Sequence, residues 1–339
     1  MATRTGARRT TRALLAPAIL AMAITAGCSS ANPTPSSTPS SAQSSDTTSS
    51  GSSAAEGGSV TIMAAGDIAQ SGSKLANAAA TGDLIRRVNP DAVLALGDQA
   101  YEDGHPGDYA TKYRPTWGSF KGKTHPVPGN HDYHSDPPVG YLGYFGKERV
   151  TNPVDGGVYY AWNVGNGWRA YAMNTEVDTS GDQLAWLKQD LSAHPAKHYI
   201  LYGHKPRYSS GDQHGPSDTI CPLWDALEAT GKLEIVLAGH EHIYERFARM
   251  DCGGHKSPRG PRSFVVGSGG NQLYGLSTPL PGSQFRNNTD FGVLKLVLGR
   301  SSYRWSFIAS GRGFDGSTSI DTNRAGRVID SGTQSTHAP

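Results

Sequence analysis

The chain has 339 residues, enough for one large domain or two small ones, and a formal net charge of only +2. So small a charge argues against the strongly basic surface that nucleic-acid-binding proteins use, and the sequence has no acidic tail for a basic partner. We therefore expect no nucleic acid as a stable partner, and nothing in the composition implies a protein partner.

Residues 1–28 are expected to be an export signal rather than part of the fold. A basic stretch, MATRTGARRTTR, precedes the apolar stretch ALLAPAILAMAITA, which is shorter than the roughly 20 residues that span a bilayer. TAGC at 25–28 is similar to a bacterial lipoprotein cleavage box, in which Cys28 would carry the lipid, and Arg8 and Arg9 hint at twin-arginine export. Ordinary cleavage and secretion is the alternative. Both place the protein outside the cytoplasm, and a lipid on Cys28 would hold it at the membrane surface.

Both ends of the mature chain are polar. Residues 29–58 are almost wholly Ser, Thr, Pro, Ala and Gly and contain no Leu, Ile, Val or aromatic residue, so they cannot form a core. We expect this segment to be a flexible tether. The composition turns polar again from Gly311, and residues 313–339 are expected to form a tail outside the folded domain, which would span 59–312.

The first half of that domain has a strand–helix–strand rhythm. VTIMAA (60–65) and AVLALGD (92–98) are apolar runs typical of buried strands, and a helix over 77–88 separates them. HPVPGNHD (125–132) is a further short extended piece. This order predicts a partly parallel sheet with helices on its faces.

The second half contains more strands and only two clear helices. A hairpin is expected over 158–174, and helices over 181–193 and 221–231. Further strands are expected at 198–204, 233–240, 263–270, 292–299 and 302–309. The residues left over, 100–125 and 205–220, are long loops, which in compact domains are usually functional or disordered. One domain built from two packed sheets is the simplest interpretation.

Five apolar strands run directly into a glycine followed by a polar residue. Those polar residues are Asp67, Asp98, Asn130, His204 and His240. Ligand sites in α/β proteins lie beyond the carboxyl ends of the strands, so these side chains would converge. Carboxylate, amide and imidazole groups are metal donors. The chain has no G-x-S-x-G motif and no P-loop, so serine-hydrolase and P-loop nucleotide chemistry have no support.

The ordered blocks GD (66–67), GDQAY (97–101), GNHD (129–132), GH (203–204) and GHEHIYER (239–246) resemble the calcineurin-like metallophosphoesterases. Within them the sequence looks most like the purple acid phosphatases. Ala69 stands where most members of the larger family have a histidine, and Tyr101 follows Asp98 by three residues, as in the purple acid phosphatases. The resemblance implies an α/β fold, a four-layer α/β/β/α sandwich of two mixed β-sheets.

The resemblance also implies a dinuclear metal centre. Its first metal would be held by Asp67, Asp98, Tyr101 and His242, and its second by Asp98, Asn130, His204 and His240, with Asp98 bridging the two. A phenolate favours Fe(III), and the other ion would be divalent Fe, Zn or Mn, among which ligand chemistry does not choose.

Catalytic roles follow from the same resemblance. A hydroxide bridging the metals would attack phosphorus, and His131 would contact the substrate and protonate the leaving group. Asp132 would orient the His131 imidazole; the alternative is that His131-Asp132 is only a turn. His214 would be a second active-site histidine, and Arg207 would help bind phosphate.

The expected function is hydrolysis of small phosphomonoesters outside the cytoplasm. The alternatives are a phosphodiesterase acting on nucleotides or glycerophosphodiesters, and an inactive tethered lipoprotein that only binds its ligand. If Cys28 is lipidated, Cys221 and Cys252 are left to form a disulfide outside the cytoplasm; two unpaired thiols are the alternative.

Overall fold

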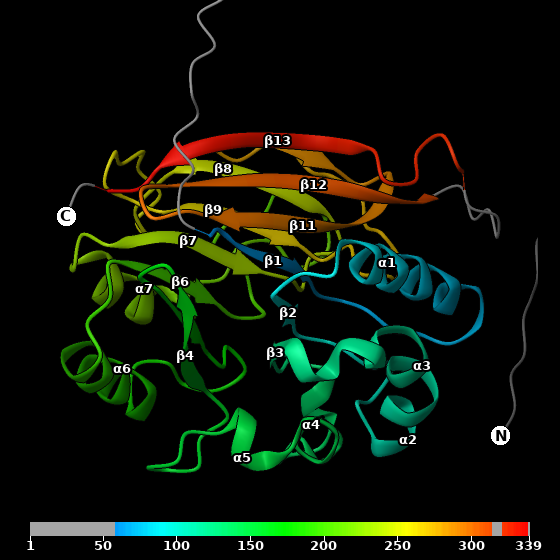
Figure 1. Cartoon of the computed structure of the whole chain (residues 1–339). Coiled ribbons are helices and arrows are strands. Elements are labelled where there is room, and N and C mark those ends of the chain that lie inside the picture. Colours follow the sequence, from blue (N-terminus) through cyan, green and yellow to red (C-terminus); the bar gives the residue numbers. More distant parts are fainter. Residues whose placement is uncertain (1–57, 314–320, 338–339) are drawn as a thin grey trace, which may run out of the picture. The chain divides into compact units, whose positions relative to one another are not determined.

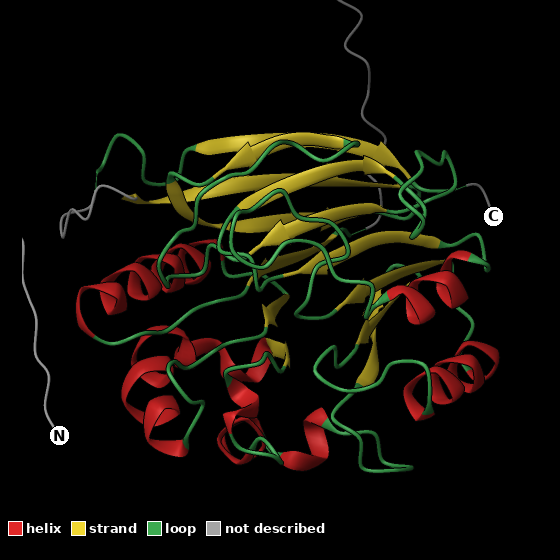
Figure 2. Ribbon diagram, turned by 180° about the vertical axis from the view of Figure 1, so that it is seen from behind, coloured by secondary structure: helices red, strands yellow, loops and turns green. Residues whose placement is uncertain are grey.

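The computed structural model describes residues 58–313 and 321–337, in which two β-sheets pack between helices (Figures 1 and 2). The first sheet has six strands in the order β13-β12-β11-β1-β2-β3. Its strands are β1 (Val60–Ala65), β2 (Ala92–Leu96), β3 (Thr124–Val127), β11 (Asp290–Leu298), β12 (Ser302–Gly313) and β13 (Val328–Ser335). β1, β2 and β3 are parallel, and β11, β12 and β13 add antiparallel pairs, so the sheet is mixed.

The second sheet has seven strands in the order β10-β8-β9-β7-β6-β5-β4. Its strands are β4 (Tyr160–Gly165), β5 (Trp168–Ala172), β6 (His198–Tyr202), β7 (Leu233–Ala238), β8 (Tyr244–Arg249), β9 (Arg262–Val266) and β10 (Ser283–Asn287). β5, β6, β7 and β9 run parallel, whereas β4, β8 and β10 pair antiparallel, so this sheet is mixed too.

Helices cover the outer faces of both sheets, which confirms the expected four-layer fold. Between β1 and β4 the chain forms η1 (Gly72–Lys74), α1 (Leu75–Val88), α2 (Pro106–Asp108), η2 (Tyr109–Tyr113), α3 (Arg114–Trp117), η3 (Gly118–Lys123), η4 (Asp132–His134), α4 (Val139–Phe145) and α5 (Lys147–Val150). Of these, α1, η3 and α5 contact the first sheet. α1 packs on β11 and β12. α6 (Asp182–Ala193) and α7 (Cys221–Glu228) cover the second sheet, where Leu187 and Trp224 join the side chains of β5 to β7 in one apolar cluster.

The central strands are buried because both of their faces are covered. Every residue of β2, β6 and β7 is buried, which explains why these segments are mainly apolar, with His198 and Glu234 as the exceptions, rather than alternating. The larger core cluster takes side chains from both sheets, including Leu94 and Leu296 from the first and Tyr202 and Phe264 from the second. The two sheets therefore share one core.

Two expectations about chain organisation were wrong. The polar segment 313–339, expected to be a tail, contains β13, which pairs with β12 at the edge of the sheet. Its residues alternate in exposure and bury Asp330, a pattern that a polar edge strand can satisfy without an apolar run. Residues 100–125, expected to be a loop, contain α2, η2, α3 and η3, which are too short to show helical periodicity.

The expected export signal, Cys28 and residues 29–57 of the tether lie outside the described residues. Within 58–313 and 321–337, no helix combines the length and apolar character needed to cross a membrane.

Candidate metal centre

The site is built from the turns that follow β1, β2 and β7. Three of the predicted ligands have left-handed backbone angles, with φ of 60° at Asp67, 49° at Asp98 and 68° at His240. Such angles in non-glycine residues cost of the order of 1–3 kcal/mol and cluster at functional sites. Gly97 is needed for close approach, because a Cβ there would lie 2.2 Å from Nδ1 of His204.

One group of donors surrounds the Tyr101 hydroxyl. It lies 3.1 Å from Oδ1 of Asp67, Oδ2 of Asp98 and Nε2 of His242. Nε2 of His242 is also 3.2 Å from Oδ1 of Asp67. All four side chains are buried, so the structure gathers the four predicted ligands of the first metal.

A second group of donors surrounds the His204 ring and shares Asp98 with the first. Nε2 of His204 lies 3.4 Å from Oδ2 of Asp98, 3.2 Å from Oδ1 of Asn130 and 3.1 Å from Nδ1 of His240. Oδ2 of Asp98 thus belongs to both groups, which is the position of a bridging carboxylate.

Backbone groups orient the donors from behind. Nδ1 of His204 bonds the carbonyl of Leu96 at 2.8 Å, and Nδ1 of His242 bonds the carbonyl of Gln272 at 2.6 Å. With Nδ1–H donating, each ring keeps the Nε2 lone pair free for a metal. The amide of His240 donates to Oδ2 of Asp67, which turns Oδ1 toward Tyr101.

The electrostatics fit a bound cation. Burial raises the pKa of the Tyr101 phenol, and Asp67 and Asp98 raise it further. Burial alone would raise the pKa of the Asp98 carboxyl, but the imidazoles of His204 and His131 hold it below its ordinary value. Burial and the neighbouring His204 lower the pKa of His240. Burial alone would lower the pKa of His204, but Asp98 and Asp67 raise it to about 10, so the carboxylates favour a positive charge at this position. Hard oxygen donors beside imidazole nitrogens are a donor set that suits iron and divalent transition metals, so the residues present fit a dinuclear centre.

The family model described as Calcineurin-like phosphoesterase matches residues 60–244, which run from β1 through the two histidines after β7. The chain belongs to this family.

Its relatives include purple acid phosphatases. Purple acid phosphatase 22 of Arabidopsis thaliana is 27% identical over 254 residues, covering 68% of this chain and 56% of that protein. The Fe(3+)-Zn(2+) purple acid phosphatase 12 of the same plant is 24% identical over 232 residues, covering 59% of this chain and 49% of that protein. The chain spans about half the length of these curated relatives. The solved purple acid phosphatase PPD1 of yellow lupin has a TM-score of 0.59 at 19% identity, covering 82% of this chain and 54% of that one.

Two further predicted residues of this phosphoesterase lie against the ligand rings. The His131 ring is 4.5 Å from the Tyr101 ring between centroids, and its Nδ1 bonds the carbonyl of Glu102 at 2.6 Å. Its Nε2 lies 4.0 Å from Oδ2 of Asp98. The His214 ring stacks on the His240 ring at 4.1 Å. The structure therefore places both histidines at the rim of the metal ligands.

The role expected for Asp132 was wrong. Its carboxylate accepts hydrogen bonds from the amides of Asp98 (3.1 Å) and Gly129 (2.9 Å) and from the Tyr109 hydroxyl (2.7 Å), not from the His131 ring. Burial and the nearby Asp98 raise the pKa of the Asp132 carboxyl above its ordinary value. Asp132 ties the end of β2 to the GNHD turn, and the backbone of Glu102 orients His131 instead.

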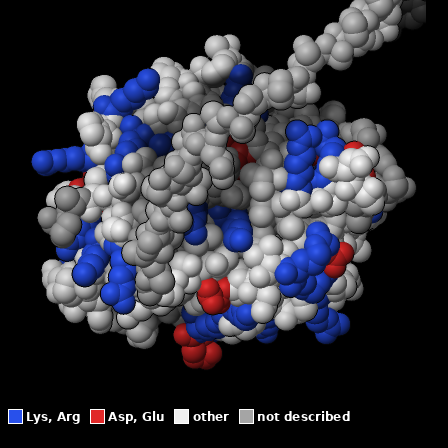
Figure 3. Space-filling model, turned by 45° about the horizontal axis from the view of Figure 1, so that its top comes forward, with Lys and Arg blue, Asp and Glu red and all other residues white. Residues whose placement is uncertain are grey.

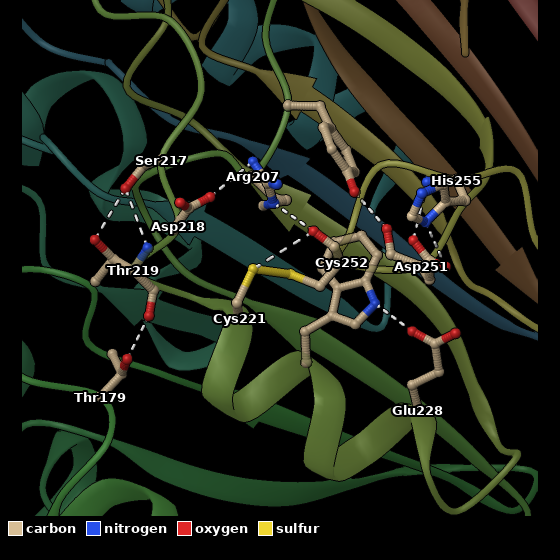
Figure 4. Close-up of a disulfide and its surroundings, with 12 residues drawn as sticks. Thr179, Arg207, Ser217, Asp218, Thr219, Cys221, Glu228, Asp251, Cys252 and His255 are labelled. Carbon is tan, nitrogen blue, oxygen red and sulfur yellow. Dashed lines mark hydrogen bonds and ion pairs between the residues drawn. A yellow bond between two sulfur atoms is a disulfide. The ribbon is translucent and has the colours of Figure 1, made fainter. Parts of the chain in front are cut away.

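Arg207 does not join the site. Its guanidinium pairs with Asp218 at 2.9 Å and donates to the carbonyl of Cys252 at 2.8 Å (Figure 4). The phosphate-binding role expected for it has no support in this geometry. Cys221 and Cys252 form a disulfide with Cα atoms 5.8 Å apart, which joins the start of α7 to the loop after β8.

Two residues that sequence reasoning missed complete the surroundings. The Tyr274 ring stacks on the His242 ring at 3.9 Å and 9°. Tyr274 follows a glycine-rich stretch without periodicity, so no pattern singled it out. Glu241, fully buried between the two histidines of GHEH, binds the loop that carries His214. Its buried position inside the motif was the available signal.

Proposed function

We propose that this protein hydrolyses phosphomonoesters outside the cytoplasm with a dinuclear metal centre of Fe(III) and a divalent Fe, Zn or Mn ion. The observation that carries the proposal is the pair of donor groups that share Oδ2 of Asp98. Membership of the phosphoesterase family and similarity to purple acid phosphatases support the same reaction. The name of the Arabidopsis Fe(3+)-Zn(2+) relative supports the metal pair.

The first group of donors would hold one ion and the second group the other, as predicted. When bound, the pair would supply a Lewis acid that activates water and stabilises the charge of the phosphoryl oxygens. The protein supplies preorganisation, because backbone hydrogen bonds already orient the buried donors Asp67, His204 and His242.

His131 would protonate the leaving group. With Nδ1–H donated to the carbonyl of Glu102, a second proton on Nε2 would face the site, where it can pass to the departing ester oxygen. His214 lies over His240 and would contact the phosphoryl group from another side.

The disulfide supports a location in an oxidising compartment. With the signal-like residues 1–28 it favours an extracytoplasmic protein, either secreted or held at the membrane surface through Cys28. A small phosphoester is the proposed partner. Figure 3 shows separate clusters of lysine and arginine on the face in view, with acidic side chains beside some of them. The formal net charge of the whole chain is only +2, so no stable nucleic-acid partner is proposed.

The test is phosphate release from an aryl phosphomonoester and an aryl phosphodiester by the purified protein, with its metal content measured. We expect monoester turnover, about two metal ions per chain, and a loss of about 10²-fold in kcat for His131→Ala, the range typical of a proton donor. A preference for the diester would replace the proposal with a phosphodiesterase. A full metal complement without turnover of either ester would favour a binding role.

A further inference from the structure

The loop at 209–215 is fastened to the metal centre through one carboxylate. Glu241 lies between the predicted ligands His240 and His242 and is fully buried. Its Oε1 accepts the amide of Gln213 at 3.1 Å, and its Oε2 accepts the amides of His214 at 2.8 Å and Gly215 at 3.0 Å. Three consecutive backbone donors thus converge on this side chain.

The loop wraps closely around the same carboxylate. A Cβ at Gly211 would lie 2.1 Å from Oε1 of Glu241, so the approach requires glycine. A buried carboxylate is costly unless hydrogen bonds replace its water, and the three charge-assisted bonds to the loop supply that replacement. The fit is therefore mutual: Glu241 needs the loop in this position, and the loop is held there by Glu241.

Neighbouring contacts fix the base of the loop but not its tip. Glu245 accepts the amide and the hydroxyl of Ser210, each at 2.6 Å. Gly211 pairs with Leu276, and the amide of Ser277 donates to the carbonyl of Ser210 at 2.8 Å. Residues 213–215, at the tip, take their side-chain anchorage from Glu241.

His214 is the residue that this anchorage delivers to the site. Its amide is bound by Glu241, and its ring stacks on the His240 ring at 4.1 Å and meets the Tyr274 ring at 5.7 Å. We propose that Glu241 is a positioning residue: it links the strand end that carries both ligand histidines to the loop that presents His214 to the phosphoester. The expected effect on kcat rests on the proposed function, whereas the expected effect on the position of the loop does not.

The test compares Glu241→Gln, His214→Ala and the double variant in the full chain, with Glu228→Gln on α7 as a control for replacing a partly buried glutamate. The glutamine amide would present N–H to donors, so hydrogen–deuterium exchange at the amides of 213–215 should rise by at least about tenfold, while metal content stays unchanged. The kcat for an aryl phosphomonoester should fall about 10- to 100-fold. In the His214→Ala background, Glu241→Gln should change kcat by less than about twofold, because the two residues act as one unit.

Affinity for inorganic phosphate, measured by calorimetry in the wild type and the same four variants, separates this inference from the proposed function. If the wild type turns over no ester, the proposed function fails, while exchange and phosphate affinity still decide the inference. The inference would be overturned if hydrogen–deuterium exchange at 213–215 were unchanged in Glu241→Gln. It would also be overturned if the fall in kcat of the double variant equalled the product of the falls in the two single variants. If Glu241→Gln does not fold, Gly211→Ala should displace the carboxylate without changing the charge and give the same pattern.

Discussion

At the scale of single residues, Tyr101 makes the sharpest prediction. Its hydroxyl lies 3.1 Å from a donor atom of each of the other three residues in the first group, and its ring packs against the His131 ring. Tyr101→Phe keeps the ring and removes one donor. Loss of a group that only hydrogen-bonds a metal ligand lowers metal affinity by at least about tenfold, so loss of a direct ligand should lower affinity for the first metal by more than that.

Metal bound per chain, measured by mass spectrometry after dialysis against a weak chelator, checks the Tyr101 prediction. Tyr113→Phe, which removes the hydroxyl of an equally buried tyrosine on η2, should keep the wild-type ratio. Equal ratios in the two variants would mean that Tyr101 is a core residue and not a ligand.

Residue roles were predictable where a side chain ends a strand, and not where the partner lies elsewhere in the chain. Asp67 and Asp98 end the neighbouring strands β1 and β2 of the first sheet, and His204 and His240 end the neighbouring strands β6 and β7 of the second. Strand order therefore brings each pair together, and the packing of the two sheets against each other joins the pairs. Asp132 was assigned to its neighbour His131, but Tyr109 and two backbone amides compete for its carboxylate. Arg207 meets Asp218 and Cys252 only after the chain has folded.

At the scale of elements, strand prediction succeeded for most central strands and for the edge strands β3 and β4, but it missed the interior strand β8 and the edge strands β10 and β13. β2, β6 and β7 are covered on both faces, so their sequences are mainly apolar, with His198 and Glu234 as the exceptions. β10 and β13 lie at sheet edges and keep polar side chains in the solvent, which removes the apolar signal. Their pairing depends on β8 and β12, which lie far away in the sequence.

The contact between β3 and β4 should make the protein sensitive to acid. The His125 ring on β3 stacks on the Trp162 ring of β4 at 3.7 Å and 7°, which joins the edges of the two sheets. Burial, with a smaller effect of Arg149, lowers the pKa of His125 from 6.5 to about 4. Below pH 6.5 the unfolded chain binds a proton that the folded chain does not, so stability falls from pH 6.5 to about 4, by about 3 kcal/mol in all.

His125→Phe removes this titration and keeps an aromatic ring for Trp162. Between pH 7 and pH 4, its free energy of unfolding should therefore fall by about 3 kcal/mol less than that of the wild type. Urea unfolding at several pH values measures the difference. Parallel curves for the two proteins would show that the folded state accepts a proton on His125 without cost.

At the scale of the whole molecule, the disulfide should contribute substantially to stability. It closes a loop between Cys221 and Cys252, which are 31 residues apart, and a loop of this length predicts about 3–4 kcal/mol from the restricted unfolded chain. The double change Cys221→Ser and Cys252→Ser should lower the free energy of unfolding by that amount, and dithiothreitol should have the same effect on the wild type. An unchanged urea midpoint in both would show that the disulfide does not stabilise the folded domain.

The extent of the folded domain gives the last prediction, because β13 makes contacts that a disordered tail would not. Buried Asp330 accepts hydrogen bonds from the Tyr244 hydroxyl at 2.8 Å, Nε of Arg246 at 2.8 Å and Nε1 of Trp305 at 3.2 Å. Tyr244 and Arg246 belong to GHEHIYER, so the C-terminal strand braces the segment that carries His240 and His242. Without this carboxylate, the Arg246 side chain, which is only 13% exposed, would lose its ion pair.

Asp330→Ala should therefore lower the free energy of unfolding by about 3 kcal/mol, as expected when one partner of a buried ion pair is removed. Ser331→Ala, at an exposed position of the same strand, should change it by less than about 0.5 kcal/mol. A chain ending at residue 312 should lose more than Asp330→Ala, since it also uncovers the edge of β12. If Asp330→Ala and the truncated chain unfold at the same urea concentration as Ser331→Ala, the domain ends near residue 312, and β13 adds nothing to the metal-binding segment.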